Sequence, residues 1–194
     1  MRYLIRTTAW HEERYAWAHE LQESLGEDAV LVADHRTEEE RKAAPGGYEN
    51  YLAALELAQD GGAWLIEDDA VLTSRFAEKA AWEVKRHPHV LLQGYSFADA
   101  DLTRGERWRP PHTFVANVCV YIPEPMACLL YAWAVAWEKP ADHRDKRCDP
   151  MVRAFLVAHE LDYWNIVPNL AQARPSFSVR LGRTYAAAAS KTLE

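Results

Sequence analysis

Three consecutive carboxylates, Glu67, Asp68 and Asp69, directly follow the apolar run Ala63–Ile66. Charges beside a buried strand lose hydration and repel one another unless a cation or a hydrogen-bond donor compensates them. If the chain stays extended, Glu67 and Asp69 share one face and Asp68 points to the other. Two carboxylates on one face suit Mg²⁺ or Mn²⁺, which keeps coordination positions for phosphate oxygens. The pattern therefore favours a cation site that neutralises a diphosphate and assists its departure as a Lewis acid.

A structural alternative exists for the same residues. One Asp would cap the next helix, and the other two acids would be solvated. Thr73 or Ser74 can already serve as that cap, which weakens this alternative. The acidic triplet is therefore the first candidate site.

The elements that must position these acids alternate between strands and helices. We predict strands at residues 2–7, 28–33, 63–66, 90–93, 115–122 and 163–167, and helices ending near residue 25 and at 48–59, 74–86, 124–137 and 149–159. This alternation indicates an α/β fold with a mixed, mainly parallel sheet flanked by helices. Ligands of such sheets collect beyond the carboxyl ends of the strands, where the acidic triplet lies.

Composition limits the class of protein. The chain has 194 residues, of which 49% are hydrophobic, which fits one domain with a sizeable core and excludes intrinsic disorder. A net charge of -7 disfavours a DNA or RNA polymer as the main partner. Three cysteines without a CxxC pair indicate neither a disulfide framework nor a zinc site. The polar start is unlike a signal peptide, and Met126–Trp137 is only about half of the ~20 residues that a membrane helix needs. We expect no membrane span and a cytoplasmic location.

The stretch from Asn50 through YLAALELAQDGGAWLIEDDAVLTSRF resembles the central motif of small GT-A-type glycosyltransferases, including the lipopolysaccharide-type family and short phage-encoded relatives. Their pattern is a helix with an Asn, a hydrophobic strand and then an acidic DxD-type motif. Downstream, VANVCVYIPEPMACLL and DPMVRAFLVAHELDYWNIVPNL resemble the family's acceptor-side strand and a later helix–strand segment. The resemblance covers residues 2–182 in order.

This resemblance implies a single-domain GT-A-like (Rossmann-like) fold over residues 1–183, followed by a C-terminal tail at 184–194. It implies a glycosyltransferase that moves a sugar from a nucleotide-diphosphate donor to an acceptor hydroxyl, with Mn²⁺ or Mg²⁺ as cofactor. Asp69 would bind the metal, and Glu67 would lie beside the metal or the donor ribose. Asp68 would support the donor from the same turn.

The resemblance places a further group of residues against the donor: Arg6, Thr7, Thr8, Arg14, Asp34 and Asn50. The first three match the strand end where such enzymes begin to hold the nucleotide. Arg14 would reach the diphosphate, Asp34 would meet the base or ribose, and Asn50 would face the donor. The alternatives are a strand-edge charge for Arg6, a loop cap for Asp34 and a solvated helix position for Asn50.

Asp149 has two interpretations. In the resembling enzymes, an acidic residue here lies over the acceptor site and serves as a general base for the attacking hydroxyl. The dipeptide Asp149-Pro150 is also a favourable helix start, with Asp as N-cap and Pro at the first helical position.

One departure from the family concerns the segment after Pro168–Gln172. The family often has a His there that completes the metal site, but this chain continues with Ala173 and Arg174. Ala offers no ligand and Arg is a permanent cation. Either water fills the position, or Arg174 neutralises the diphosphate, so the need for a metal stays open at this point.

The acceptor substrate is the feature that the sequence predicts least well. Trp108, in a polar stretch with Arg104, Arg107 and Arg109, is the best acceptor-contact candidate, although an ordinary solvated loop explains it equally well. A glycan, a protein or a modified nucleobase would all be suitable acceptors, and the oligomeric state is not readable. Two alternative functions are a receiver-like Mg²⁺-binding signalling domain and a protein that binds nucleotide sugars without transferring them.

Overall fold

A seven-stranded sheet forms the centre of the computed structural model, which describes residues 1–37, 39–40, 47–96, 107–115, 117–137, 148–174, 176–178 and 183–185. In spatial order the strands are β2 (Ala29–Asp34), β1 (Arg2–Thr8), β3 (Ala63–Glu67), β7 (Cys119–Ile122), β5 (Leu92–Gln93), β8 (Tyr163–Asn165) and β6 (Arg107–Arg109). Two small ladders accompany it: β4 (Ala70–Leu72) with β9 (Ala171–Ala173), and β10 (Ser176–Ser178) with β11 (Arg183–Tyr185).

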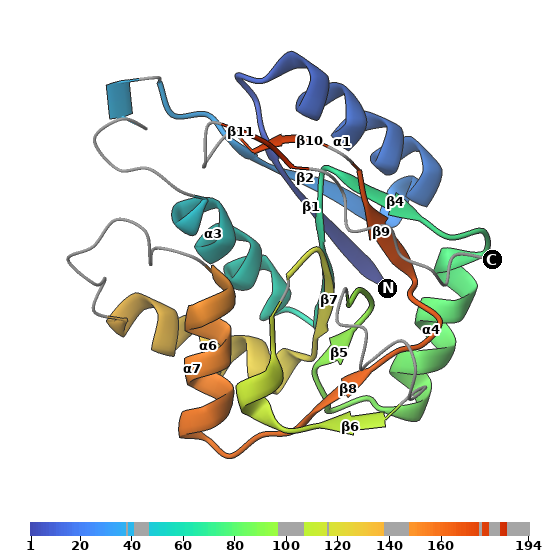
Figure 1. Cartoon of the computed structure of the whole chain (residues 1–194), viewed down its shortest axis with the longest axis vertical. Helices are drawn as coiled ribbons and strands as arrows, with labels where there is room; N and C mark the ends of the chain where they lie inside the picture. Colours follow the sequence, from blue (N-terminus) through green and yellow to red (C-terminus); the bar gives the residue numbers. More distant parts are fainter. Residues whose placement is uncertain are drawn as a thin grey trace.

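Helices cover both faces of the sheet (Figure 1). One face carries α1 (Glu12–Leu25) and α4 (Phe76–Arg86), and the other carries α3 (Tyr48–Ala58), α6 (Glu124–Ala136) and α7 (Cys148–Ala158). Short 3₁₀ turns lie at Gly26–Asp28 and Pro111–Thr113. In Figure 1 the first pair of helices lies to the right of the sheet and the other three lie to the left.

Strand direction confirms the predicted fold class. β1 pairs in parallel with β2 and β3, and β5 pairs in parallel with β8. β7 is antiparallel to β3 and β5, and β6 is antiparallel to β8. Five of the seven strands therefore run in one direction, so the sheet is mixed but mainly parallel, which is consistent with a Rossmann-like fold and fits a GT-A-like one. Receiver domains have the strand order 2-1-3-4-5 in a doubly wound sheet, and the antiparallel β7 beside β3 departs from it.

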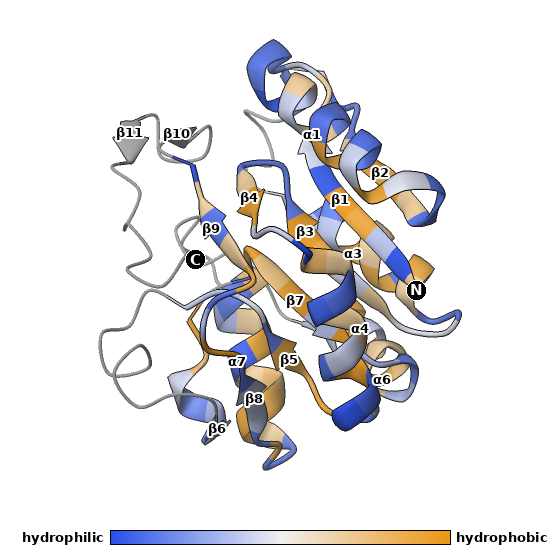
Figure 2. Cartoon of the chain, turned by 90° about the vertical axis from the view of Figure 1, so that its right-hand side faces the viewer, coloured by the Kyte–Doolittle hydropathy of each residue, from blue (hydrophilic) through white to orange (hydrophobic). Residues whose placement is uncertain are grey.

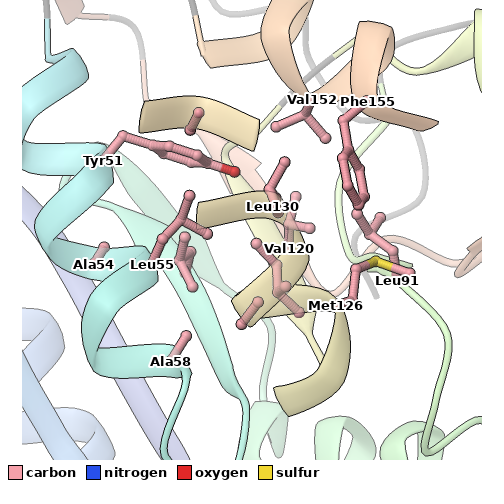
Figure 3. Packing of buried hydrophobic residues seen from close by; sticks show 14 of the residues in the cluster. Tyr51, Ala54, Leu55, Ala58, Leu91, Val120, Met126, Leu130, Val152 and Phe155 are labelled. Atoms are coloured by element: carbon pink, nitrogen blue, oxygen red, sulfur yellow. The ribbon is translucent and has the colours of Figure 1, made fainter. Parts of the chain in front are cut away.

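The alternation of side chains along the central strands divides the core into two clusters. Leu4 and Leu65 point to α3, α6 and α7, where Tyr51 and Leu55 pack against the side chains of α6 and α7 (Figure 3). Ile5, Trp64 and Ile66 instead join the cluster under α1 and α4. Figure 2 shows the central strands in hydrophobic colours between the two helical layers. Because both faces are covered, the central strands β3 and β7 are almost continuous apolar runs.

The predicted elements are present, with some ends shifted. The strand predicted at 115–122 begins at Cys119, β5 is only two residues long, and α4 begins at Phe76 rather than residue 74. The three-residue strands β4, β6, β9, β10 and β11 were not predicted, because three residues are too few to display a period.

The predicted boundary between domain and tail falls inside β11, since Thr184 belongs to that strand. Residues 186–194 of the predicted tail lie outside the described residues. Across the part of the chain that the structure describes, no helix combines the length and the hydropathy needed to cross a membrane.

Candidate active site at the carboxyl edge of the sheet

The ends of β1 and β3 bring the basic and acidic candidates together. The two strands are parallel neighbours, and Arg6 pairs in register with Glu67. The backbone amide of Asp68 donates to the carbonyl of Arg6 at 3.1 Å, which fixes the start of the acidic turn against β1. Sixty-one positions separate Arg6 from Glu67 in the chain, but the parallel pairing places them side by side at the carboxyl edge of the sheet.

Arg6 is a buried cation, so the alternative of a strand-edge charge is wrong. Its side chain is 8% exposed, and Nη2 donates to Glu67 Oε1 at 2.6 Å. The guanidinium lies 4.9 Å from the centre of the Tyr51 ring and 3.8 Å from Cys148 Sγ. Burial alone would lower the pKa of Arg6, but Glu67 and other nearby acidic groups, Asp149 among them, raise it above its usual value.

Arg14 binds the other two acids of the triplet. It lies in the first turn of α1, which follows the end of β1. Its Nε donates to Asp68 Oδ1 at 2.8 Å, and its Nη2 contacts the same oxygen and lies 3.6 Å from Asp69 Oδ2. Burial raises the pKa of Asp68, and the guanidinium of Arg14 opposes this shift.

The three acids differ in their access to solvent. The side chains of Glu67 and Asp69 are 33% and 14% exposed, whereas that of Asp68 is 1% exposed. The condition for the predicted alternation is not met, because Asp68 and Asp69 form a turn rather than an extended strand. Asp68 is nevertheless the buried acid of the three. The capping alternative is wrong, because β4 follows the acids directly and Arg75 is the residue that precedes α4.

Glu67 and Asp69 are thus the two more exposed carboxylates of the triplet. Among the described residues, no group of three or more His, Cys, Asp or Glu side chains is arranged to hold a metal. Mg²⁺ usually binds through one or two carboxylates together with substrate phosphates and water, rather than in an all-protein cage. The donor set fits a cation that arrives with a phosphorylated ligand.

A cavity of about 390 Å³ opens beside this edge, at the ends of β2 and α3. Asp34, the last residue of β2, lines it together with Arg36, Glu49 and Asn50. Both carboxylate oxygens of Asp34 accept from Arg36, at 2.9 and 2.8 Å, and Arg36 also pairs with Glu49 at 3.1 Å. The cavity therefore has a polar rim with a planar guanidinium held in place by two carboxylates.

Asn50 joins the two strand ends. It is buried, so the alternative of a solvated helix position is wrong. Its amide nitrogen donates to the carbonyl of Thr7 at 3.3 Å and to the carbonyl of Val32. Thr7 is buried at the end of β1, and Thr8 pairs in register with Asp34 of β2. Asn50 thus holds β1 and β2 together at the point where the cavity begins.

Asp149 lies near Arg6 at the start of α7. It belongs to the first turn of α7, which begins at Cys148, and Asn117 Nδ2 donates to its Oδ1 at 2.7 Å. Asp149 is close enough to raise the pKa of Arg6. The carboxylates of Glu67 and Asp149 therefore both act on one buried guanidinium.

Two predicted residues point elsewhere. The backbone amide of Arg174 donates to the carbonyl of Asp69 at 2.7 Å, but its guanidinium pairs with Glu20 at 3.0 Å and lies 4.9 Å from the Trp17 ring centre. The side chain of Arg174 thus lies against α1. Trp108 is not in a loop, because Arg107–Arg109 form the edge strand β6 and Trp108 lies opposite Trp164, 5.6 Å away between ring centres.

Among the described residues, the arginines around Trp108 do not form an exposed basic patch. Arg109 is buried. Arg104 and the side chain of Arg107 lie outside the described residues. An edge strand with one aromatic residue between two long polar ones has too short a pattern to be separated from a loop by sequence.

Sequence reasoning missed several residues of this edge, which are Arg36, Tyr51, Tyr95, Asn117 and Cys148. Burial, followed by the charges of Asp69 and Glu67, raises the pKa of Tyr95. None of the five belongs to a motif, and each reaches the site from a different element or connection. Only the helical spacing of apolar residues on α3 included Tyr51, and this spacing indicated a position in the core.

Comparison with known proteins shows a likeness of fold only. No model of a protein family matches the chain, and no curated protein matches its sequence. The structure is similar to the crystal structure of A197 from STIV, with a TM-score of 0.51 and 11% sequence identity. The match covers 89% of this chain and 84% of A197. The two chains share an overall fold. At this identity the likeness does not extend to residues or chemistry.

Proposed function

We propose that the chain is a glycosyltransferase that moves a sugar from a nucleotide-diphosphate donor to an acceptor hydroxyl. The observation that carries the proposal is the meeting of Arg6 and Arg14 with the carboxylates of Glu67 and Asp69 at one sheet edge, beside the cavity at Asp34. Anionic ligands of α/β sheets bind at such edges. The fold that the chain shares with A197 from STIV supports the predicted α/β architecture. The proposed chemistry rests on the residues of the site alone.

The two ends of the edge would hold different parts of the donor. The cavity with Asp34 and Arg36 suits a ribose and base, because the carboxylate can accept from hydroxyl groups and the guanidinium offers a flat surface. Arg14, already shared between Asp68 and Asp69, would bind the diphosphate. Glu67 and Asp69 would hold Mn²⁺ or Mg²⁺ together with the phosphate oxygens, and the cation would supply Lewis-acid stabilisation of the leaving diphosphate.

Asp149 is the proposed general base. The amide of Asn117 fixes one of its carboxylate oxygens and thereby orients the group. Asp149 lies near Arg6 in the first turn of α7, so an acceptor between α7 and the donor would meet this carboxylate. It would remove the proton of the attacking hydroxyl while the bond between the sugar and the diphosphate breaks.

Thermal-shift measurements with a panel of nucleotide diphosphate sugars, each with and without Mn²⁺, test the donor site. A bound donor raises the melting temperature by mass action, so at least one nucleotide should shift it. Asp69→Ala should remove the Mn²⁺-dependent part of this shift, because it removes one of the two more exposed carboxylates of the triplet. The matched control is Asp60→Ala just before β3, at its other end, where Asp60 pairs with Arg2 on the surface. It should behave as the wild type.

Product analysis separates transfer from binding alone. Release of nucleoside diphosphate in the presence of a candidate acceptor, abolished by Asp149→Ala with donor binding intact, would support the proposal. A donor that binds without hydrolysis or transfer would favour the binding-protein alternative. A panel in which no nucleotide sugar shifts the melting temperature would refute the donor site itself.

A further inference from the structure

The cavity at the ends of β2 and α3 is richer in hydrogen-bond acceptors than in donors. Among its described lining residues, the carboxylates are Asp34, Glu40 and Glu49, and the guanidinium is that of Arg36. Three negative charges and one positive charge therefore meet there at neutral pH. The composition of the lining limits what kind of ligand can bind.

The donors of the lining already bind groups of the protein. Arg36 Nε and Nη2 donate to the two carboxylate oxygens of Asp34 at 2.9 and 2.8 Å, and Arg36 Nη1 lies 3.1 Å from Glu49 Oε2. The amide nitrogen of Asn50 donates to backbone carbonyls of β1 and β2. Ionised carboxylates only accept hydrogen bonds. A ligand that fits this cavity therefore brings hydrogen-bond donors of its own.

Glu49 is the carboxylate best placed to accept from such a ligand. It lies in the first turn of α3, and its side chain is 46% exposed, against 7% for Asp34. Both oxygens of Asp34 hold Arg36. Glu40 Oε2 accepts from the backbone amide and the hydroxyl of Thr37, at 2.7 and 2.8 Å. Because a carboxylate can accept about four hydrogen bonds, Glu49 can hold Arg36 and a ligand together.

The nucleobases differ in how well their edges match a carboxylate. Guanine carries two adjacent donors, N1–H and the N2 amino group, and one carboxylate can accept from both. Adenine and cytosine each present one amino group beside an acceptor nitrogen, and uracil presents one N–H between two carbonyl oxygens. Acceptor atoms repel a carboxylate, so guanine fits the cavity best and uracil fits it least well.

The guanidinium and the size of the cavity agree with a purine. Arg36 is held between the carboxylates of Asp34 and Glu49, and a planar guanidinium stacks on aromatic rings. The two fused rings of a purine cover more of that surface than the single ring of a pyrimidine. The volume of about 390 Å³ falls in the range of about 300–1,000 Å³ that is usual for small-molecule sites.

We infer that this cavity recognises guanine, so that the sugar donor is a guanosine diphosphate sugar, with Glu49 accepting from N1–H and the N2 amino group. The inference rests on the proposed function, because it concerns the nucleotide part of the same donor site. It goes beyond that function in naming the base and the residue that selects it.

Isothermal titration calorimetry with guanosine, inosine and uridine diphosphates, each with Mn²⁺, tests the inference. Inosine diphosphate differs from guanosine diphosphate only in lacking the N2 amino group. Guanosine diphosphate should bind tightest. Inosine diphosphate should bind about tenfold more weakly or worse, because one hydrogen bond to a charged acceptor is lost. Uridine diphosphate should bind more weakly still, since its two carbonyl oxygens meet carboxylates.

Glu49→Gln should remove most of the difference between the guanosine and inosine diphosphates, because an amide N–H replaces one of the two accepting oxygens. The matched control is Glu56→Gln. Glu56 is exposed about two turns further along α3 and does not line the cavity, so this variant should keep the preference of the wild type. Circular dichroism checks that both variants fold, and the comparison of the three nucleotides in the wild type needs no variant.

The outcomes separate this inference from the proposed function. Equal affinities for the three nucleotides, or tightest binding of uridine diphosphate, would overturn the inference and leave the donor site standing. A preference for guanosine diphosphate that is undiminished in Glu49→Gln would overturn it too, because the base would then be recognised elsewhere. Absence of binding by any of the three would refute the donor site and this inference with it.

Discussion

Replacing Arg14 by Ala should destabilise the protein strongly, because it leaves Asp68 buried without its main counter-charge. Asp68 is almost inaccessible to solvent, and Arg14 Nε donates to its Oδ1 at 2.8 Å. Two opposite charges about 4 Å apart attract each other by about 4 kcal/mol at an effective dielectric constant of about 20. Removal of one partner from a buried pair destabilises proteins by about 3–5 kcal/mol. We therefore expect Arg14→Ala to lower the free energy of unfolding by about 3 kcal/mol.

The effect of pH provides a check on this explanation. Burial raises the pKa of Asp68, and without Arg14 the pKa in the folded variant rises further. A carboxyl group with a higher pKa in the folded than in the unfolded state destabilises the fold when it is ionised, and this penalty disappears once it is protonated. The difference in free energy of unfolding between wild type and variant should thus be largest near neutral pH and shrink in acid.

Urea denaturation followed by tryptophan fluorescence measures this difference. Arg75→Ala is the control, because Arg75 pairs with Glu78 on the surface and its loss should change little. Adding Asp68→Asn to Arg14→Ala should recover a large part of the lost stability, since it removes the unpaired charge. Equal denaturation midpoints for the wild type and Arg14→Ala would refute the assignment of Asp68 as a buried, Arg14-dependent carboxylate.

Two further predictions concern residues around the same edge. Asn50→Ala should lower the free energy of unfolding by about 1–3 kcal/mol, because two buried carbonyls lose their donor; an unchanged urea midpoint would mean that water satisfies them. Iodoacetamide near pH 8 should modify the exposed Cys128 well before Cys148, since burial raises the pKa of the Cys148 thiol to about 12 and leaves only about one part in 10⁴ as thiolate. Peptide mass spectrometry distinguishes the two cysteines, and modification of Cys148 at the rate of Cys128 would contradict its burial. The same shift makes the folded state keep a proton that the unfolded chain loses, so stability should fall as pH rises from about 9 to about 12.

The sequence was sufficient for the fold class because β1, β2, β3 and the helices are long enough to display a clear pattern. Ala63–Ile66 is apolar on both sides because helices cover both faces of the sheet, and this run directed attention to the acids that follow it. The short strands β4 and β9 were not predicted, because three residues are too few to display a pattern. β4 and β9 are stable only as a pair, and the partner of Ala70 is Ala173, more than one hundred positions along the chain.

The partners of the acidic triplet were the part that the sequence could not supply. Arg14 was expected to reach a diphosphate, and its contact with Asp68 depends on how α1 returns over the end of β1. Arg174 illustrates the opposite outcome, because its place in the chain is next to the acidic turn while its side chain turns to Glu20. A residue's position at the end of a strand predicts that its backbone lies at the carboxyl edge of the sheet. The direction of a long side chain there depends on the packing around it.

The balance of charge at the edge connects these observations to the proposed chemistry. Glu67, Asp68, Asp69 and Asp149 provide four carboxylates, and Arg6 and Arg14 provide two guanidinium groups, so these six side chains have a formal charge of -2. A diphosphate adds further negative charge in a partly buried place, where like charges repel strongly. Arg14 can donate hydrogen bonds to the diphosphate, but the charges of Arg6 and Arg14 are already balanced by carboxylates and leave the added negative charge uncompensated. A divalent cation between Glu67, Asp69 and the phosphates would restore the balance, and for this reason we expect Mn²⁺ to strengthen donor binding rather than merely to accelerate transfer.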